Sequence, residues 1–164
     1  MPVDTNILLV GKDGGQTPVR RDVAIRCSML LQELLDDEAS SSEVEVPLDV
    51  LSTTTIALVV SYMTQRFQNP PAPIPKPLNG PLEKILDEID TAFVKDFTPT
   101  TTIDLVNAAN FLNYPALRDL VSAKLASIMM SMTVEENRAM LGIQQDFSAQ
   151  HEAQLRKMHG IASS

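Results

Sequence analysis

The sequence has no tryptophan, and aromatic residues make up only 4% of its 164 positions. A core built from this chain must therefore rely on Leu, Ile, Val, Ala and the eight methionines. The apolar fraction of 44% is ordinary for a globular protein. The length is enough for one domain, or for one domain with an appendage, around a substantial core.

Long apolar runs and paired cysteines are also missing. Cys27 is the only cysteine, so an internal disulfide cannot form. No stretch approaches the roughly 18 apolar residues that a membrane span needs. The start MPVDTNILLV lacks the basic segment and the long apolar run of a signal peptide. We therefore expect a protein of the cytoplasm and nucleus that does not associate with membranes.

Positive charge is scarce, because 13 Lys and Arg face 21 Asp and Glu, for a net charge of −8. Nucleic-acid binding depends on Lys and Arg that displace counterions from phosphates, so this balance argues against a nucleic-acid partner. The acidity suits docking to a basic protein surface, although solubility explains it about as well.

The residue types of an active site are sparse. His151 and His159 lie eight apart with no Cys or His at ligand spacing, which argues against a zinc site. Cys27 lies in an amphipathic pattern without a base partner, which is typical of a buried structural thiol. The glycines of GKDGG lack the phosphate-loop spacing and indicate a tight turn. We predict no enzyme, and hence no catalytic residues, cofactor or metal.

The front of the chain predicts three short strands and one helix. Strands are expected at Asn6–Val10, at QTPVRR after an Asp13-Gly14 turn, and around Val44 and Val46. Between the second and third strands, Asp22 is a plausible N-cap of a single amphipathic helix that runs to Leu35. The acidic, serine-rich stretch DDEASSSEVE then predicts a solvated loop.

The rest of the chain is mostly helical in its pattern. Helices are expected at about 52–67, over LEKILDEIDTAFVKDF, and at 100–113, 115–130, 133–141 and 148–159. Pro115 suits a first helical position, and Thr133 with Glu136 forms a capping box. Few strands at the front and helices massed behind them predict an α+β fold.

Residues 69–81 hold six of the eleven prolines. Proline excludes helix, so this segment predicts an exposed connection with some polyproline II character. A PxxP-type ligand and a plain linker both remain open, and composition alone favours the linker.

The motifs AANFLNYPALRDL, TVEENRAMLGI and DFSAQHEAQLRK occur in an order and at spacings that resemble the Skp1 family. At the front, KDGGQ, AIRCS and VPLDVLSTTTIALVVSYM resemble the same family more weakly. Skp1 is an adaptor that joins F-box proteins to a cullin in SCF ubiquitin ligases, which act in ubiquitin-dependent protein degradation. The resemblance implies a BTB/POZ domain over 1–130, with a proline-rich loop at 69–81, and a C-terminal helical extension over 131–164.

The resemblance also implies two sets of binding residues. The cullin-binding positions correspond to Asn110 and to Phe111, where the family has Tyr. By pattern alone, a helical aromatic such as Phe111 is more often core. The apolar F-box-binding positions correspond to Leu125, Met129, Leu141, Ile143 and Ile161. Periodicity alone allows the helical positions of this set to be core as well.

The chain departs from the family at three places. The family segment WDxEF keeps only Asp90 and Phe93, Arg118 replaces an apolar residue, and Ile161, after Gly160, stands where the last family helix has Trp. These departures favour a divergent member. They also leave an alternative open, in which a BTB-fold structural scaffold, with a weak homodimer through the front domain, acts outside ubiquitin ligases.

Overall fold

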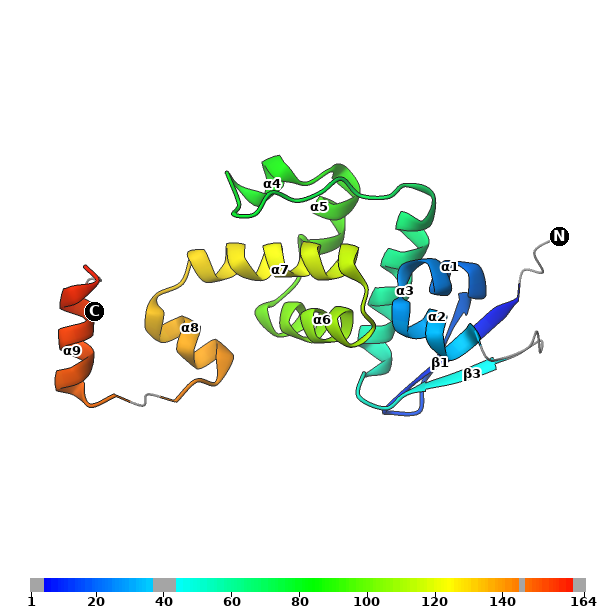
Figure 1. Ribbon diagram of the computed structural model, residues 1–164, viewed down its shortest axis with the longest axis horizontal. Helices are drawn as coiled ribbons and strands as arrows, with labels where there is room; N and C mark the ends of the chain where they lie inside the picture. The colour runs from blue at the N-terminus through cyan, green and yellow to red at the C-terminus, as the bar shows by residue number, and fades with distance from the viewer. Residues whose placement is uncertain (1–4, 37–43, 145–146, 161–164) are drawn as a thin grey trace. The chain divides into compact units, whose positions relative to one another are not determined.

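A computed structural model describes residues 5–36, 44–144 and 147–160 (Figure 1). The elements in chain order are β1 (Asn6–Gly11), β2 (Gln16–Arg20), α1 (Arg21–Cys27), α2 (Met29–Asp36), β3 (Val44–Leu48), α3 (Thr53–Gln68), α4 (Leu82–Ile85), α5 (Glu88–Val94), α6 (Pro99–Phe111), α7 (Pro115–Met130), α8 (Val134–Leu141) and α9 (Ala149–Met158). This mixed composition confirms the α+β class. The chain divides into two compact units, unit 1 (Met1–Ile128) and unit 2 (Met129–Ser164), which are described separately.

The three strands form one sheet in the order β2-β1-β3, with β1 antiparallel to β2 and parallel to β3. The register pairs Ile7 with Val19 on one side and with Val44 on the other. Because side chains alternate along a strand, this register places the three apolar side chains on one face, and all three are buried. The predicted strands at the front of the chain are confirmed.

The β1–β2 turn is tied to the start of α3. Gly14 adopts a left-handed conformation with φ 80°, which glycine tolerates without steric cost. Asp13 Oδ1 accepts hydrogen bonds from the Thr53 amide at 2.9 Å and from the Thr53 hydroxyl at 2.6 Å. A side chain at Gly15 would come within 2.3 Å of the Thr53 hydroxyl. The glycines therefore allow a close approach between the turn and the helix, as well as the turn itself.

The helix expected from Asp22 to Leu35 is two helices, α1 and α2, so that prediction is wrong in two respects. Helix α1 begins at Arg21, and Asp22 lies in its first turn, not at the N-cap. The chain breaks at Ser28, which is extended (φ −124°, ψ 121°) and buried. The Ser28 hydroxyl accepts a hydrogen bond from the Leu31 amide and donates one to the Leu112 carbonyl at 2.5 Å. Ser28 thus starts α2 and joins it to a segment 84 residues away.

Helix α3 carries the main apolar face of unit 1. Ser52 caps its N-terminus by accepting from the Thr55 amide, as Ser commonly does at this position. Ile56, Val59, Val60 and Met63 are buried, and the half-buried Phe67 packs against the same core. Helix α3 contacts β1 and β2 on one side and α6 on another. The helix expected at about 52–67 is confirmed.

The segment LEKILDEIDTAFVKDF forms two short helices, α4 and α5, where one was expected. Asp87 interrupts the pattern because it caps α5, accepting a hydrogen bond from the Asp90 amide at 2.9 Å. The same carboxylate accepts from Arg66 of α3 at 2.6 Å.

A buried ion pair joins α5 to α3. Arg66 and Asp90 are 4% and 3% exposed, and their closest nitrogen–oxygen distance is 2.5 Å. The hydroxyl of buried Tyr62 donates to Asp90 at 3.0 Å, and the Tyr62 ring lies 4.9 Å from that of Phe93. Burial, followed by the charge of Asp90, raises the pKa of Tyr62, so this hydroxyl remains a donor. Buried Asp90 and half-buried Phe93 therefore both belong to this cluster.

Arg66 is fully charged in this cluster. Burial alone would lower the pKa of Arg66, but its hydrogen bonds to Asp87 and Asp90 outweigh that effect and raise the pKa. The hydrogen bond from Arg66 in turn lowers the pKa of Asp87. The fold therefore holds a permanent cation in its interior, and the carboxylates around it are needed to balance that charge.

Helices α6 and α7 are joined by a tight turn. Pro99 and Pro115 begin the two helices, at positions where the missing amide costs no hydrogen bond. Helix α6 ends at Phe111, two residues before the predicted end, because Asn113 turns left-handed with φ 48°. Asn tolerates that conformation better than most residues and commonly follows a helix end.

In unit 2 the predicted helix boundaries agree closely with the structure. Thr133 and Glu136 form the expected capping box at the start of α8, with both reciprocal hydrogen bonds present. Ser148 caps α9 by accepting from the His151 amide. Helix α9 ends at Met158, and Gly160 follows with φ 64°. Most of the predicted acidic loop, residues 37–43, lies outside the described residues.

The Arg66 cluster leads to a stability prediction. Asp90→Ala leaves a buried guanidinium with Asp87 as its only carboxylate, and Tyr62 loses its acceptor. Breaking a buried pair in this way costs about 3 kcal/mol or more of the free energy of unfolding. Urea denaturation followed by circular dichroism at neutral pH measures the change.

Asp96→Ala is the matched control, because Asp96 is 85% exposed and lies 3.9 Å from Lys95. We expect it to change the free energy of unfolding by less than about 0.5 kcal/mol. Equal effects of the two substitutions would show that the buried pair is not a main stabilising contact.

Candidate partner-binding surfaces

Asn110 and Phe111 lie in the last turn of α6, where both side chains are exposed. Phe111 is 43% exposed, whereas the neighbouring Ala108, Ala109 and Leu112 are buried. The structure therefore places the phenyl ring at the surface of unit 1 and excludes the alternative that it is a core residue. Aromatic side chains are enriched at protein-binding surfaces, so an exposed ring is a candidate contact.

Hydrogen bonds hold the turn behind Phe111 on both sides. The amides of Leu112 and Tyr114 donate to the carbonyls of Ala108 and Ala109, each at 2.9 Å. The Ser28 hydroxyl, just before α2, and the Leu30 amide of α2 both donate to the Leu112 carbonyl. The exposed ring is thus carried by a backbone that packing and hydrogen bonds fix in place.

The same surface extends onto α2. Met29 is 52% exposed, its amide donates to the Asn113 carbonyl at 3.3 Å, and its sulfur lies 3.3 Å from the Asn113 side-chain nitrogen. Met29 and Leu34 belong to the segment expected as one continuous amphipathic helix, but the chain breaks at Ser28 and both side chains are exposed, Leu34 to 47%. The signal that was missed is Ser28 itself, a capping residue within the apolar pattern.

Cys27 and Tyr114 lie behind this turn and carry no charge. Burial raises the pKa of the Cys27 thiol. Burial, and then the neighbouring Cys27, raises the pKa of Tyr114. A thiol with a raised pKa is a poor nucleophile at neutral pH, which agrees with a structural role for Cys27.

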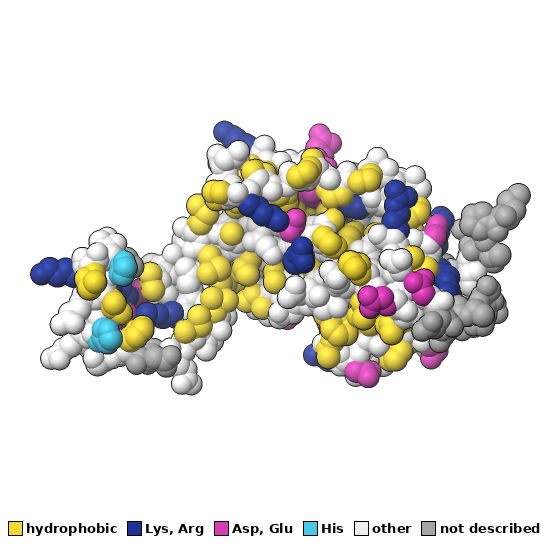
Figure 2. Space-filling model, in the orientation of Figure 1, with side chains coloured by type: hydrophobic (Ala, Val, Ile, Leu, Met, Phe, Trp, Pro, Cys, Tyr) yellow, Lys and Arg dark blue, Asp and Glu magenta, His cyan; other side chains and the backbone are white. Residues whose placement is uncertain are grey.

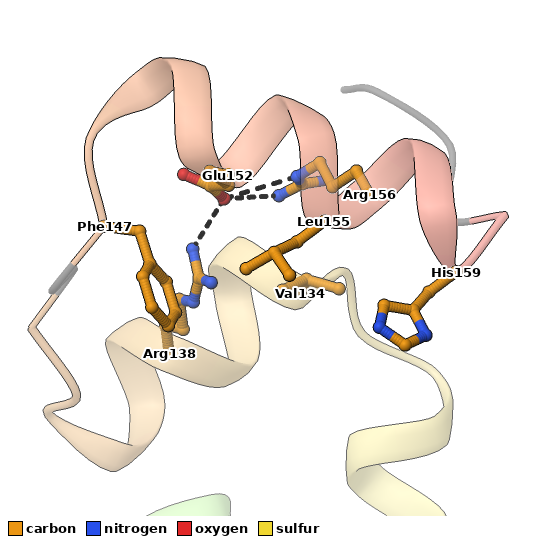
Figure 3. A pocket seen from close by; sticks show the side chains of 7 residues that line it. All are labelled: Val134, Arg138, Phe147, Glu152, Leu155, Arg156 and His159. Carbon is orange, nitrogen blue, oxygen red and sulfur yellow. Dashed lines mark hydrogen bonds and ion pairs between the residues drawn. The ribbon is translucent and has the colours of Figure 1, made fainter.

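In unit 2, α8 and α9 are joined by a chain of charged side chains (Figure 3). Glu152 of α9 accepts from Arg138 of α8 at 2.8 Å and from Arg156 of its own helix at 3.0 Å. Arg156 also pairs with Glu135 of α8. Two acidic and two basic groups thus alternate between the helices, and a network of this kind is stronger than an isolated surface pair.

Hydrogen bonds from Arg138, and then from Arg156, lower the pKa of Glu152. A depressed pKa in the folded state means that the charged carboxylate stabilises the unit at pH values above its unfolded pKa. That contribution is lost as the pH falls through the lower, folded pKa. The junction of α8 with α9 is therefore acid-sensitive at pH values below about 4.5.

A small cavity of about 100 Å³ lies between the two helices beside this network. Figure 3 shows Val134, Phe147 and Leu155 around it, together with the charged groups and His159. The Phe147 ring lies 5.0 Å from the His151 ring. The junction between α8 and α9 thus combines a small apolar patch with ion pairs beside it.

The predicted F-box positions differ in exposure. Leu141 and Ile143 are 40% and 55% exposed. Leu125 and Met129 are half-buried, and Ile161 lies outside the described residues. Left-handed Gly142, with φ 65°, ends α8, and the Ile143 amide donates to the Arg138 carbonyl at 3.0 Å. This glycine cap fixes the backbone on which Leu141 and Ile143 are exposed.

Further apolar side chains of unit 2 are also exposed. They are Met130, Val134, Phe147 and Met158. Both histidines are exposed, and Figure 2 shows their side chains at the surface. With Leu141 and Ile143, the described part of unit 2 thus has six large exposed apolar side chains, which is typical of a surface that a partner covers.

Across 5–36, 44–144 and 147–160, no three His, Cys, Asp or Glu side chains are grouped so that they could hold a metal ion. Within those same ranges, no helix has both the length and the apolar character that a membrane crossing requires.

Comparison with known proteins adds an independent observation. The sequence profile described as Skp1 family, dimerisation domain, matches residues 115–161. The S-phase kinase-associated protein 1 homolog of Tetrahymena thermophila is 26% identical over 154 residues, which cover 93% of this chain and 91% of that protein. SKP1-like protein 14 of Arabidopsis thaliana is 29% identical, with 95% of each chain covered. The E3 ubiquitin ligase complex SCF subunit sconC of Aspergillus clavatus is 28% identical, with 94% and 96% covered.

The charged network of unit 2 can be tested by substitution. Glu152→Ala removes the carboxylate that joins Arg138 to Arg156, so we expect the amide hydrogens of α9 to exchange several-fold faster. Hydrogen exchange measured by NMR or mass spectrometry gives this rate. Gln154→Ala is the control, since Gln154 is exposed and residues two apart do not share a helix face. Unchanged exchange in both variants would show that the ion pairs do not hold α9.

Proposed function

We propose that this chain is a divergent member of the Skp1 family and an adaptor that bridges an F-box protein to a cullin in an SCF-type ubiquitin ligase. The observation that carries the proposal is the exposed Phe111 on a fixed turn, at the position where the family binds its cullin. The relative named as an SCF subunit matches nearly the full length of this chain.

The proposed cullin surface is the turn at Asn110 and Phe111. An aromatic side chain that is exposed in the free protein can supply much of the binding energy when a partner buries it. Its backbone is held by buried Leu112 and Ser28, so little conformational entropy is lost on binding. The net charge of −8 favours association with a basic surface on the partner.

The proposed F-box-binding positions are Leu125 and Met129 of α7, Leu141 and Ile143 at the end of α8, and Ile161. Leu141 and Ile143 expose apolar area that water solvates poorly and that a partner helix could cover. Met129 adds a flexible, polarizable side chain that adapts to different partner shapes. The profile match over residues 115–161 includes all five positions.

The proposed mechanism is tethering, not catalysis. A chain that holds a substrate receptor and a ligase scaffold together converts their encounter into an intramolecular event and raises the effective concentration of the substrate. Such a role requires two separate surfaces and a stable body, and it requires no activated nucleophile. Burial raises the pKa of the Cys27 thiol, which keeps it a poor nucleophile, as a tethering role allows.

The cullin surface is tested by Asn110→Lys combined with Phe111→Lys. Two cations replace the ring and the amide at the centre of the proposed contact, so we expect binding of a purified cullin N-terminal domain to be abolished. The thermal midpoint should change little, because both side chains are exposed. Calorimetric titration and a thermal melt measure the two quantities.

Gln65→Lys with Gln68→Lys is the matched control, because it adds the same charge at two exposed positions of α3. It should leave cullin binding intact. Equal loss in the two double variants would attribute the effect to net charge. A large fall in the midpoint of the first variant would show that Phe111 stabilises the fold.

The tail gives a second prediction. The missing family Trp leaves Ile161, whose burial is worth no more than roughly 1.5–3 kcal/mol. Deleting residues 160–164 should therefore weaken F-box binding by less than about tenfold, or roughly 1.4 kcal/mol. Deleting 148–164 should weaken it far more, since that removes α9 with Glu152 and Arg156.

One F-box peptide titrated calorimetrically into the full chain and the two shortened chains measures both effects. Abolished binding after the five-residue deletion would show that the tail is an anchor. Unchanged binding after the longer deletion would remove α9 from the proposed surface.

A further inference from the structure

The proline-rich segment 69–81 is not used by the proposed adaptor function, and it is not a loose linker. The Asn69 carbonyl accepts from Arg66 of α3 at 3.3 Å. Ile74 is half-buried and packs against the core of unit 1. Lys76 pairs with Asp119 of α7 at 2.9 Å. Three contacts along eight residues therefore hold the segment against the body, where a spacer would need none.

Exposed side chains recur at every third residue from Pro70 to Lys76, and Ala72 is exposed as well. Pro70, Pro73 and Lys76 are exposed, while Pro71, Ile74 and Pro75 are half-buried. A polyproline II helix has three residues per turn, so residues three apart lie along one edge. Residues 69–76, all of them described, are assigned to neither helix nor strand. The pattern indicates an extended proline ridge with one edge on the protein and the other in solvent.

We propose that residues 70–76 are a docking ligand for a protein domain of the SH3 type, whose groove is lined by aromatic side chains and flanked by carboxylates. Pro70-Pro71-Ala72-Pro73 supplies the PxxP spacing that such grooves bind. Proline rings pack on aromatic faces, and the restricted backbone loses little entropy when it is bound.

The proline ridge carries a positive charge at its C-terminal end only. Lys76 is the only charged residue between Gln68 and Glu83, and its side chain remains 68% exposed although it pairs with Asp119. A carboxylate of the partner can therefore approach the ammonium group at one end of the ridge. The partner would thus be recognised by two prolines in an apolar groove and by one cation at its acidic edge.

This surface involves none of the residues proposed to bind cullin or F-box partners. Asn110 and Phe111 lie in α6, and the F-box positions lie in α7 and beyond. The docking segment would add a third partner without altering either of the other surfaces.

The test uses the full chain and, as probes, a panel of purified SH3 domains measured by biolayer interferometry. We expect at least one domain to bind with micromolar affinity. For that domain, Pro70→Ala with Pro73→Ala should weaken binding by about tenfold or more, since it removes both exposed prolines of the ridge. The thermal midpoint of that variant should stay unchanged, because the substituted side chains are exposed.

Pro71→Ala with Pro75→Ala is the matched control, as it removes the same number of prolines from the half-buried edge. It should weaken binding by less than about threefold, well under the 1.4 kcal/mol that tenfold represents. Equal losses in the two variants would overturn the assignment of the binding edge. Absence of binding across the whole panel would overturn the proposal.

Discussion

The ion pair between Arg66 and Asp90 is the contact on which unit 1 depends, because it joins α3 to α5 across the proline-rich segment 69–81 and the short helix α4. Around the pair, Tyr62 donates to Asp90 and its ring contacts those of Phe93 and Tyr114. Tyr114 directly precedes α7, and Arg66 also binds the Asn69 carbonyl where the proline segment begins. The charged core thus fixes the start of α7 and of the proline ridge together.

The proposed cullin surface follows from this arrangement. Phe111 is exposed because the chain turns at Leu112 and Asn113, and that turn is held by Ser28 on one side and by Tyr114 in the aromatic cluster on the other. A ring on such a support is presented in one orientation and loses little freedom on binding. Unit 2 is built differently, because ion pairs and small apolar contacts join α8 to α9 and leave more apolar surface exposed.

The sequence predicted correctly those helix and turn boundaries that are set by residues within a few positions of them. Pro115, the Thr133–Glu136 capping box and the Asp13-Gly14 turn each determine structure within a few positions. The break at Ser28 was missed because its partner, the Leu112 carbonyl, lies 84 residues away. The break at Asp87 was missed for a similar reason, since its carboxylate both caps α5 and pairs with Arg66 of α3. The binding residues were taken from family resemblance, and neither periodicity nor charge would have separated the exposed Phe111 from a core residue.

The central claim is that one chain holds two different partners at the same time. Multi-angle light scattering of this protein with a purified cullin N-terminal domain and an F-box peptide fused to a carrier protein tests it most directly. The account predicts a single species with the mass of one copy of each, and an F-box affinity that saturating cullin does not change. Mutually exclusive binding, or a homodimer of this chain that binds neither partner, would contradict it.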